Sequence, residues 1–150
     1  MEVSNLKERH WQVPSKKGLI RKKKMCMIQV GTQLHASDNS GARIVQCVKV
    51  LRKPKKKMGR VGALVVVSVK TLVRKQKSKV KKGHLYKAIV CETKKHTLRV
   101  DGSNVACSRN TGILLSLQGT PIGSRIQGIT PYELRVKGRT KLLSLSLANI

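Results

Sequence analysis

Short runs of apolar residues, each closed by a turn, constrain the fold of this chain more than any other feature. The runs cover residues 27–34, 44–51, 63–69, 85–91 and 112–117, with Gly, Asp or Pro between them. The chain has no Phe, one Trp and two Tyr, so Val, Ile and Leu must build its core. β-Branched residues pack well on pleated sheets, and a closed sheet exposes no edge strands. We therefore predict a mainly β protein organised around a small closed barrel.

A polar insert between the first two runs has the residues of a tight corner. The short side chains of Asp38, Asn39 and Ser40 are suited to capping backbone amides, and Gly41 tolerates a positive φ. Many β proteins connect two strands with such residues, so a plain structural turn is one interpretation. Arg43 follows the turn, where its planar guanidinium could grip a phosphate or a carboxylate.

Net charge is the strongest indication of function. The chain has 33 Lys and Arg against 6 Asp and Glu, for a net charge of +27, so internal ion pairs could neutralise few of the cations. Such an excess favours a polyanionic partner, RNA or DNA in the first place. An anionic membrane surface is disfavoured because the sequence lacks a basic amphipathic helix, and no apolar run is long enough for a transmembrane helix.

The cations fall into lysine-rich loops and single arginines beside predicted turns. Lysine clusters would neutralise phosphates diffusely, whereas an oriented arginine can make a bidentate contact. The shortage of aromatic residues argues against base stacking and favours recognition of the backbone and shape of folded RNA. The predicted RNA-binding residues are Arg43, Lys49, Arg52, Lys53, Lys55, Lys56, Lys57, Arg60, Lys81, Lys82, Lys94, Lys95, Arg99, Arg109 and Arg125.

Other site chemistry finds little support in the sequence. The four cysteines, at positions 26, 47, 91 and 107, form no CxxC pair and have no histidine at metal-ligand spacing, so we predict reduced, structural thiols and no metal site. His35 and Asp38 lie close together, but no nucleophile-elbow pattern accompanies them. Phosphate-loop fingerprints are absent. We therefore predict no cofactor and no enzymatic activity.

Composition divides the chain into three parts. Residues 1–26 are predicted to form a basic flexible N-terminal extension, either an organelle transit peptide or a retained RNA-binding tail. Residues 27–118 would form the barrel, and residues 119–150 a region of loops and short helices packed on it. Within the barrel part, Asp101-Gly102-Ser103 predicts a second tight turn.

The last part begins with an extended loop and then has the signals of a helix start. Thr130 is the expected cap, Pro131 suits the first helical position, and Glu133 lies in the first turn. Residues 139–147 fit either a second short helix or an extended arm, because their leucines also follow a period of two.

Several stretches appear in the order of a known family and together cover residues 28 to about 147. They closely resemble the ribosomal protein fourteen family of the large subunit, in its bacterial and organellar form. The stretches are Ile28-Gln29, Asp38-Asn39-Ser40-Gly41-Ala42-Arg43, Cys47-Val48-Lys49-Val50-Leu51, Val80-Lys81-Lys82-Gly83, Thr93-Lys94-Lys95, Asp101-Gly102-Ser103, Pro121-Ile122-Gly123-Ser124-Arg125-Ile126, Glu133-Leu134-Arg135 and Ser144-Leu145.

This resemblance implies a fold and a set of partners. The expected fold is a five-stranded β-barrel with a projecting β-ribbon and a C-terminal region of loops and short helices. The expected partners are large-subunit rRNA, the neighbouring large-subunit proteins three and nineteen, small-subunit rRNA through an inter-subunit bridge, and a ribosome-silencing factor. No membrane partner is expected.

The chain also departs from the family pattern. Ala63 and His84 stand where the family often places an acid after glycine, and Cys107 stands where an aromatic is common. The extension over residues 1–24 has no counterpart in typical bacterial members, so we expect a mitochondrial ribosome, with a plastid or bacterial cytoplasm as the alternative. A free small-barrel RNA-binding regulator or RNA chaperone is the alternative function.

Overall fold

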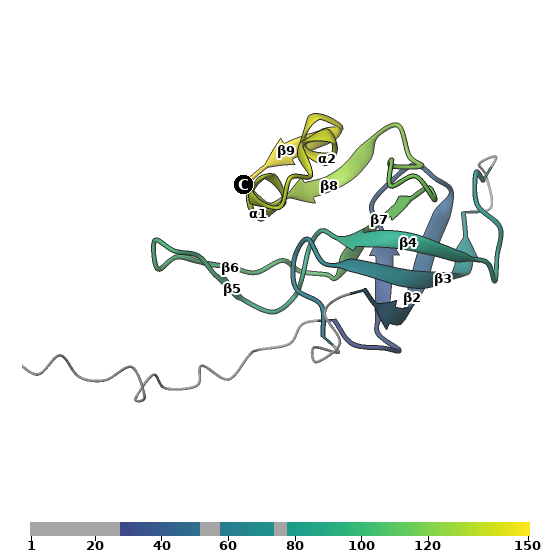
Figure 1. The fold of residues 1–150 in the computed structure, drawn as a ribbon, viewed down its shortest axis with the longest axis horizontal. Coiled ribbons are helices and arrows are strands. Elements are labelled where there is room, and N and C mark those ends of the chain that lie inside the picture. The colour runs from purple at the N-terminus through teal and green to yellow at the C-terminus, as the bar shows by residue number, and fades with distance from the viewer. Residues whose placement is uncertain (1–27, 52–57, 74–77) are drawn as a thin grey trace, which may run out of the picture.

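The computed structural model describes residues 28–51, 58–73 and 78–150. Five strands close into a barrel in the order β1-β2-β3-β4-β7, and Figure 1 shows this barrel as the widest part of the molecule. The neighbouring strands are antiparallel except for β7 and β1, which pair in parallel and complete the closure. The prediction of a mainly β fold with a small barrel is confirmed. The barrel strands are β1 (Gln33–Ala36), β2 (Ala42–Val50), β3 (Leu64–Leu72), β4 (Leu85–Val90) and β7 (Thr111–Leu115).

Aliphatic side chains fill the barrel, as the composition requires. Along β3, Val65, Val67 and Val69 are fully buried while the residues between them are half-buried, which is the period-two pattern of a barrel strand. They belong to one core cluster that also contains Leu34 from β1 and Leu114 from β7. Burial of these side chains is the main stabilisation of the barrel.

The first strand begins later than the sequence indicates. We expected a strand over residues 27–34, but Thr32 N donates to the carbonyl of Gln29 (3.2 Å), so a turn interrupts the apolar run. Ile28 instead forms an isolated bridge with Gly59 and is fully buried. Apolar character indicated the burial of Ile28 and Leu34, but Val30 between them is exposed, and the pattern could not distinguish a strand from a turn.

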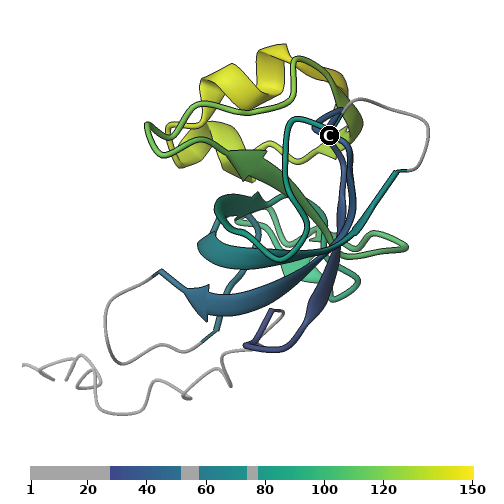
Figure 2. The same ribbon diagram turned by 90° about the vertical axis from the view of Figure 1, so that its right-hand side faces the viewer.

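The C-terminal part packs on one side of the barrel (Figure 2). It consists of β8 (Ile126–Thr130), α1 (Glu133–Val136), α2 (Thr140–Ser144) and β9 (Ser146–Asn149), with β8 and β9 paired in parallel. Leu134 and Leu142, from the two helices, join barrel residues such as Ile113 in a second core cluster. Both alternatives for residues 139–147 are therefore present, a helix followed by a strand.

The predicted cap of the first helix is wrong. The residue before α1 is Tyr132, and no side chain caps the helix. The hydroxyl of Thr130 instead bonds Ser146 Oγ (2.8 Å), because Thr130 is the last residue of β8 and faces β9. Glu133 does lie in the first turn of the helix. Neither helix in the described part of the chain is long and apolar enough to cross a membrane.

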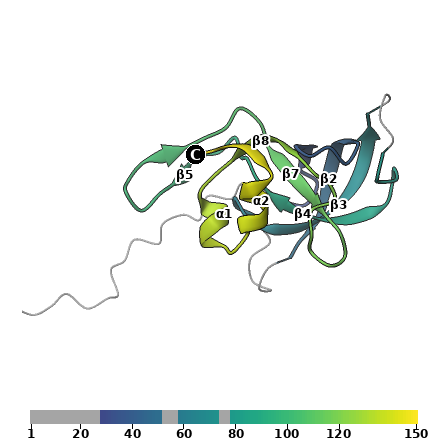
Figure 3. The same cartoon turned by 90° about the horizontal axis from the view of Figure 1, so that it is seen from above.

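A small ribbon extends beyond the barrel and beside α1 (Figures 1 and 3). It is formed by β5 (Thr97–Leu98) and β6 (Asn104–Val105), paired antiparallel. The predicted turn joins them: Ser103 donates from its amide (2.9 Å) and its hydroxyl (2.7 Å) to Asp101 Oδ1. Residues 70–82 are rich in lysine. This segment begins as the end of β3, and its residues 74–77 lie outside the described residues.

Candidate nucleic-acid interface

The corner after β1 is held by a buried aspartate. Asp38 is 6 % exposed. Its Oδ1 accepts hydrogen bonds from Ser40 Oγ (2.6 Å) and Ser40 N (3.4 Å), and its Oδ2 accepts one from Leu114 N on β7 (3.0 Å). Burial raises the pKa of Asp38 above its ordinary value, although these hydrogen bonds oppose the shift. Asp38 thus holds the backbone of the corner and also ties the corner to the barrel.

Gly41 completes the corner through its conformation and its close neighbour. Its φ is +92°, and a Cβ on it would lie 2.7 Å from Ser78 Cα. Its carbonyl accepts a hydrogen bond from Val73 N (2.9 Å), and the Ser40 carbonyl accepts one from Lys79 N (2.8 Å). Only glycine fits a left-handed backbone this close to another chain segment. The corner therefore anchors the residues on both sides of the segment 74–77.

Arg43 lies in an irregular part of the β2–β3 ladder immediately after this corner. Ala42 pairs with Leu72, Ile44 with Thr71 and Val45 with Val69, so the register shifts after Ala42 and shifts back at Val45. Arg43 has no register partner on β3 in this irregular part, and it is exposed.

A groove with a volume of about 900 Å³ lies beside Arg43. It brings together two of the predicted RNA-binding residues, Arg43 from β2 and Arg109 from the segment before β7. Polar side chains and the end of β3 complete its wall. The other lining residues include His35, Asn39, Thr71, Leu72, Val73 and Gln127.

The remaining predicted cations lie at several places on the surface. Five of the fifteen, Arg52, Lys53, Lys55, Lys56 and Lys57, lie outside the described residues. Arg99 is half-buried, and the others with a described position are exposed: Arg43, Lys49, Arg60, Lys81, Lys82, Lys94, Lys95, Arg109 and Arg125. Apart from Arg43 and Arg109, none of these residues lines the groove.

Comparison with known families decides what kind of protein presents this surface. The model of the family described as ribosomal protein L14p/L23e matches residues 27–150, which include every element of the fold. The chain belongs to the ribosomal protein L14p/L23e family. It is therefore a structural, non-enzymatic protein of the large ribosomal subunit, and the resemblance seen in the sequence is confirmed.

Two stretches that carry the L14p/L23e resemblance contact each other in the fold. Asn39 Nδ2 donates to Ser124 Oγ (3.0 Å), and Arg125 N donates to Asn39 Oδ1 (3.2 Å). Gly123 lies so close to the corner that a Cβ on it would be 2.7 Å from Asp38 Cβ. The predicted turn residues thus dock the C-terminal part of this L14p/L23e protein onto the barrel.

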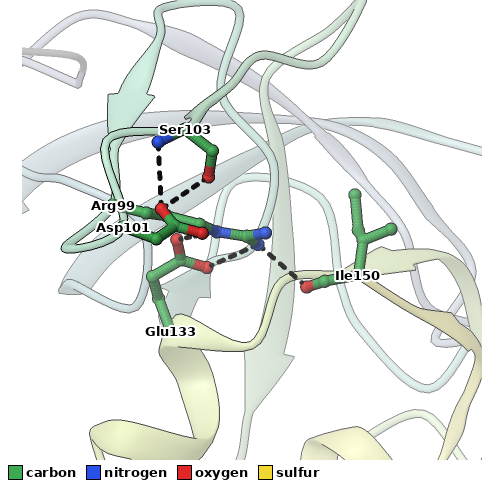
Figure 4. Close-up of polar contacts among 5 residues, drawn as sticks. All are labelled: Arg99, Asp101, Ser103, Glu133 and Ile150. Atoms are coloured by element: carbon green, nitrogen blue, oxygen red, sulfur yellow. Dashed lines mark hydrogen bonds and ion pairs between the residues drawn. The ribbon is translucent and has the colours of Figure 1, made fainter.

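Arg99, predicted to bind RNA, contacts the protein itself (Figure 4). Its Nε and a terminal nitrogen donate to the two carboxylate oxygens of Glu133 (3.0 and 3.4 Å), and the same terminal nitrogen donates to the Ile150 carbonyl (3.0 Å). Burial raises the pKa of Glu133, but the hydrogen bonds and the charge of Arg99 outweigh it, so that pKa is below its ordinary value. Arg99 fastens the ribbon to the C-terminal part.

Glu92 is a site residue that the sequence did not single out. It follows β4, its side chain is 6 % exposed, and its Oε2 lies 3.6 Å from Arg109 Nε. Its Oε1 accepts a hydrogen bond from Ile129 N (2.9 Å). An acid directly after a buried apolar strand, in a chain with 6 acids, was the available signal, because buried carboxylates need partners.

The three cysteines of the described residues form no disulfide with one another. Cys47 and Cys91 are buried and Cys107 is half-buried. Burial raises the pKa of Cys91 to about 12, so its thiol stays protonated and unreactive. No cluster of three metal-ligating side chains occurs in the described part of the chain.

Proposed function

We propose that this chain binds large-subunit rRNA directly, through lysine-rich loops and oriented arginines held at fixed positions by the barrel. The observation that carries the proposal is the exposure of the predicted cations: within the described residues, nine of the ten have exposed side chains. Glu133 and Glu92 pair with Arg99 and Arg109, which leaves most of the positive charge without an internal counterion.

The mechanism is electrostatic. Phosphates of folded rRNA repel one another, and cations placed between them neutralise that repulsion as the strands approach. Exposed lysines supply this neutralisation with little geometric demand, whereas an arginine at a fixed position can hold one phosphate in a bidentate contact. The barrel contributes rigidity, because its strands fix the spacing between the cations.

The same proposal includes a position near the subunit interface. We place the chain beside large-subunit proteins three and nineteen, with a bridge to small-subunit rRNA and a surface that receives a ribosome-silencing factor. These assignments rest on the resemblance of residues 28–147 to the family.

Sedimentation tests the ribosomal assignment in cells. The tagged full chain should sediment with the large subunit in a sucrose gradient and remain there after a high-salt wash that removes loosely bound proteins. A free RNA-binding regulator would stay at the top of the gradient or leave the subunit in the wash. That outcome would contradict the proposal.

We further propose a mitochondrial ribosome as the location, because residues 1–26 precede the matched region. Purified organelles should contain the protein, and mass spectrometry should identify the N-terminus of the mature chain. A cleaved basic segment would support import, whereas recovery of the chain only in plastids or in a bacterial cytoplasm would overturn this location.

A further inference from the structure

The groove beside the corner carries positive charge at two fixed points. Arg43 lies in the irregular part of β2, and no residue of the described part of the chain forms an ion pair with it. Arg109 lines the same groove, and its side chain is 54 % exposed. Arginines at two defined positions of one concave surface can hold two anionic groups at a defined spacing.

Glu92 fixes the second of these arginines. Its carboxylate is nearly buried and lies 3.6 Å from Arg109 Nε, while the Arg109 side chain as a whole is 54 % exposed. The Ile129 amide holds the other carboxylate oxygen, which restricts the position of the acid. A buried carboxylate that is itself held in place orients the group paired with it.

Asp38, the acidic residue among those that line the groove, accepts its hydrogen bonds from groups of the protein itself. Both carboxylate oxygens of Asp38 accept hydrogen bonds from Ser40 and Leu114, so Asp38 has its acceptors engaged inside the corner. The walls also carry the side chains of His35 and Gln127, which are exposed. Hydrogen-bonding side chains next to cations match the ribose hydroxyls that alternate with phosphates along RNA.

We propose that this groove binds a segment of RNA sugar–phosphate backbone, with Arg43 and Arg109 on phosphates and with Glu92 as the residue that positions Arg109. This inference rests on the proposed rRNA binding and assigns it a specific site. The lining residues include no Phe, Tyr or Trp, so the groove has no large aromatic platform for stacking bases. Its volume of about 900 Å³ is near the upper end for small-molecule pockets, about 300–1,000 Å³, and suits a strand rather than a single phosphate.

An acidic protein segment is the competing occupant. RNA is favoured because two oriented guanidiniums beside hydrogen-bonding groups match alternating phosphate and ribose, and because the whole chain carries a net charge of +27. An acidic peptide would be bound mainly by the positive charges of the two arginines and would make little use of the hydrogen-bonding groups beside them.

Binding of the full chain to large-subunit rRNA at several salt concentrations tests the site. We expect Arg43→Gln and Arg109→Gln each to weaken binding about tenfold or more and to reduce the slope of log K against log salt by about 0.7–0.9. Arg135→Gln on α1 is the matched control, because it removes the same charge from an exposed arginine outside the groove. We expect it to weaken binding less than threefold or so.

The outcomes distinguish a failure of the groove inference from a failure of the proposed function. If the groove variants bind as tightly as the control while wild-type binding is tight and salt-dependent, the groove inference is wrong and rRNA binding stands. If wild-type binding itself is weak or independent of salt, the proposed function fails. Poly-L-glutamate tests the competing occupant: if the groove variants lose affinity for it but keep full affinity for rRNA, the occupant is acidic protein.

A double-mutant cycle tests the positioning role of Glu92. Glu92→Gln keeps an oxygen that can accept from the Ile129 amide, and thermal unfolding would verify that the variant is folded. We expect it to weaken rRNA binding in the wild-type background and to have no further effect in the Arg109→Gln background. Equal weakening in both backgrounds would indicate a merely structural role, and tighter binding would show that Glu92 competes with RNA. Either result would overturn the positioning assignment.

Discussion

Replacing Asp38 by Asn tests whether the corner after β1 is a structural centre of the molecule. The chain contains a matched turn for comparison. In both Asp38-Asn39-Ser40 and Asp101-Gly102-Ser103, the aspartate Oδ1 accepts hydrogen bonds from the amide and the hydroxyl of the serine. They differ in burial, because Asp38 is 6 % exposed and Asp101 is exposed. Replacing Asp by Asn should therefore lower the stability of the fold much more at position 38 than at position 101.

The expected cost follows from the partner of each carboxylate oxygen. In Asp38→Asn, an amide Nδ2 would face the buried Leu114 amide, now 3.0 Å from Oδ2, and would leave it without an acceptor. A buried unsatisfied amide costs about 1–3 kcal/mol. Relief of the charge burial that raises the pKa of Asp38 offsets part of this cost. We expect a net loss of about 1–2 kcal/mol at pH 7, or about 3–6 °C in unfolding temperature.

Thermal and urea unfolding of the two variants are the assays. Asp101→Asn should leave the unfolding midpoint close to wild type. The pH dependence has a defined sign: because the folded pKa of Asp38 is raised, its contribution to stability is largest below its unfolded pKa and falls as pH rises through the folded pKa. The advantage of wild type over Asp38→Asn should thus be larger at acidic pH. Equal effects of the two substitutions, or a stabilised Asp38→Asn, would refute this account of the corner.

Three further predictions concern other parts of the fold. Gly123→Ala places a Cβ 2.7 Å from Asp38 Cβ and should lower the free energy of unfolding in urea by about 1–3 kcal/mol. Gly112→Ala is the control, because its Cβ would have its nearest contacts at 3.5 Å, and its stability should stay near wild type. Equal losses of stability in the two variants would contradict the close packing at Gly123. Glu133→Gln removes the ion pair to Arg99 and should speed hydrogen exchange of the ribbon amides while lowering stability by less than about 1 kcal/mol; unchanged exchange would show that the pair does not hold the ribbon. Cys91, with a pKa of about 12, should resist alkylation at pH 8 until the protein unfolds, as peptide mass spectrometry would show, and rapid labelling of the native protein would argue against its burial.

The barrel could be predicted from sequence because its cause is local. Runs rich in Val, Ile and Leu each end at a turn residue, and this punctuation separates β2, β3, β4 and β7. Burial alternates along β3, whereas every residue of β7 is buried. The tight turn at Asp101 was predictable for the same reason, since Asp and Ser two residues apart bond each other without help from the rest of the chain.

The pairing of strands β8 and β9 in the C-terminal part could not be predicted because its causes are distant. β8 becomes a strand by pairing with β9 some 20 residues later, and Thr130 serves that pairing instead of capping α1. A local pattern cannot report a partner so far along the chain.

The same distinction between local and distant causes applies to the candidate site. The exposure of lysines and arginines follows from their charge, and Arg43 could be singled out by its place after the turn. The ion pair that engages Arg99 and the one that holds Arg109 both depend on acids contributed by other segments, Glu133 and Glu92. Only the folded chain brings these partners together.

The salt dependence of rRNA binding tests the central claim most directly. The measurement is the equilibrium affinity of the full chain for large-subunit rRNA over a range of salt concentrations. If many exposed cations contact phosphates, log K falls linearly with log salt, with a slope of about −0.7 to −0.9 for each contact, so binding is tight at low salt and weak at high salt. An affinity that does not change with salt would contradict electrostatic recognition of rRNA by this L14p/L23e protein.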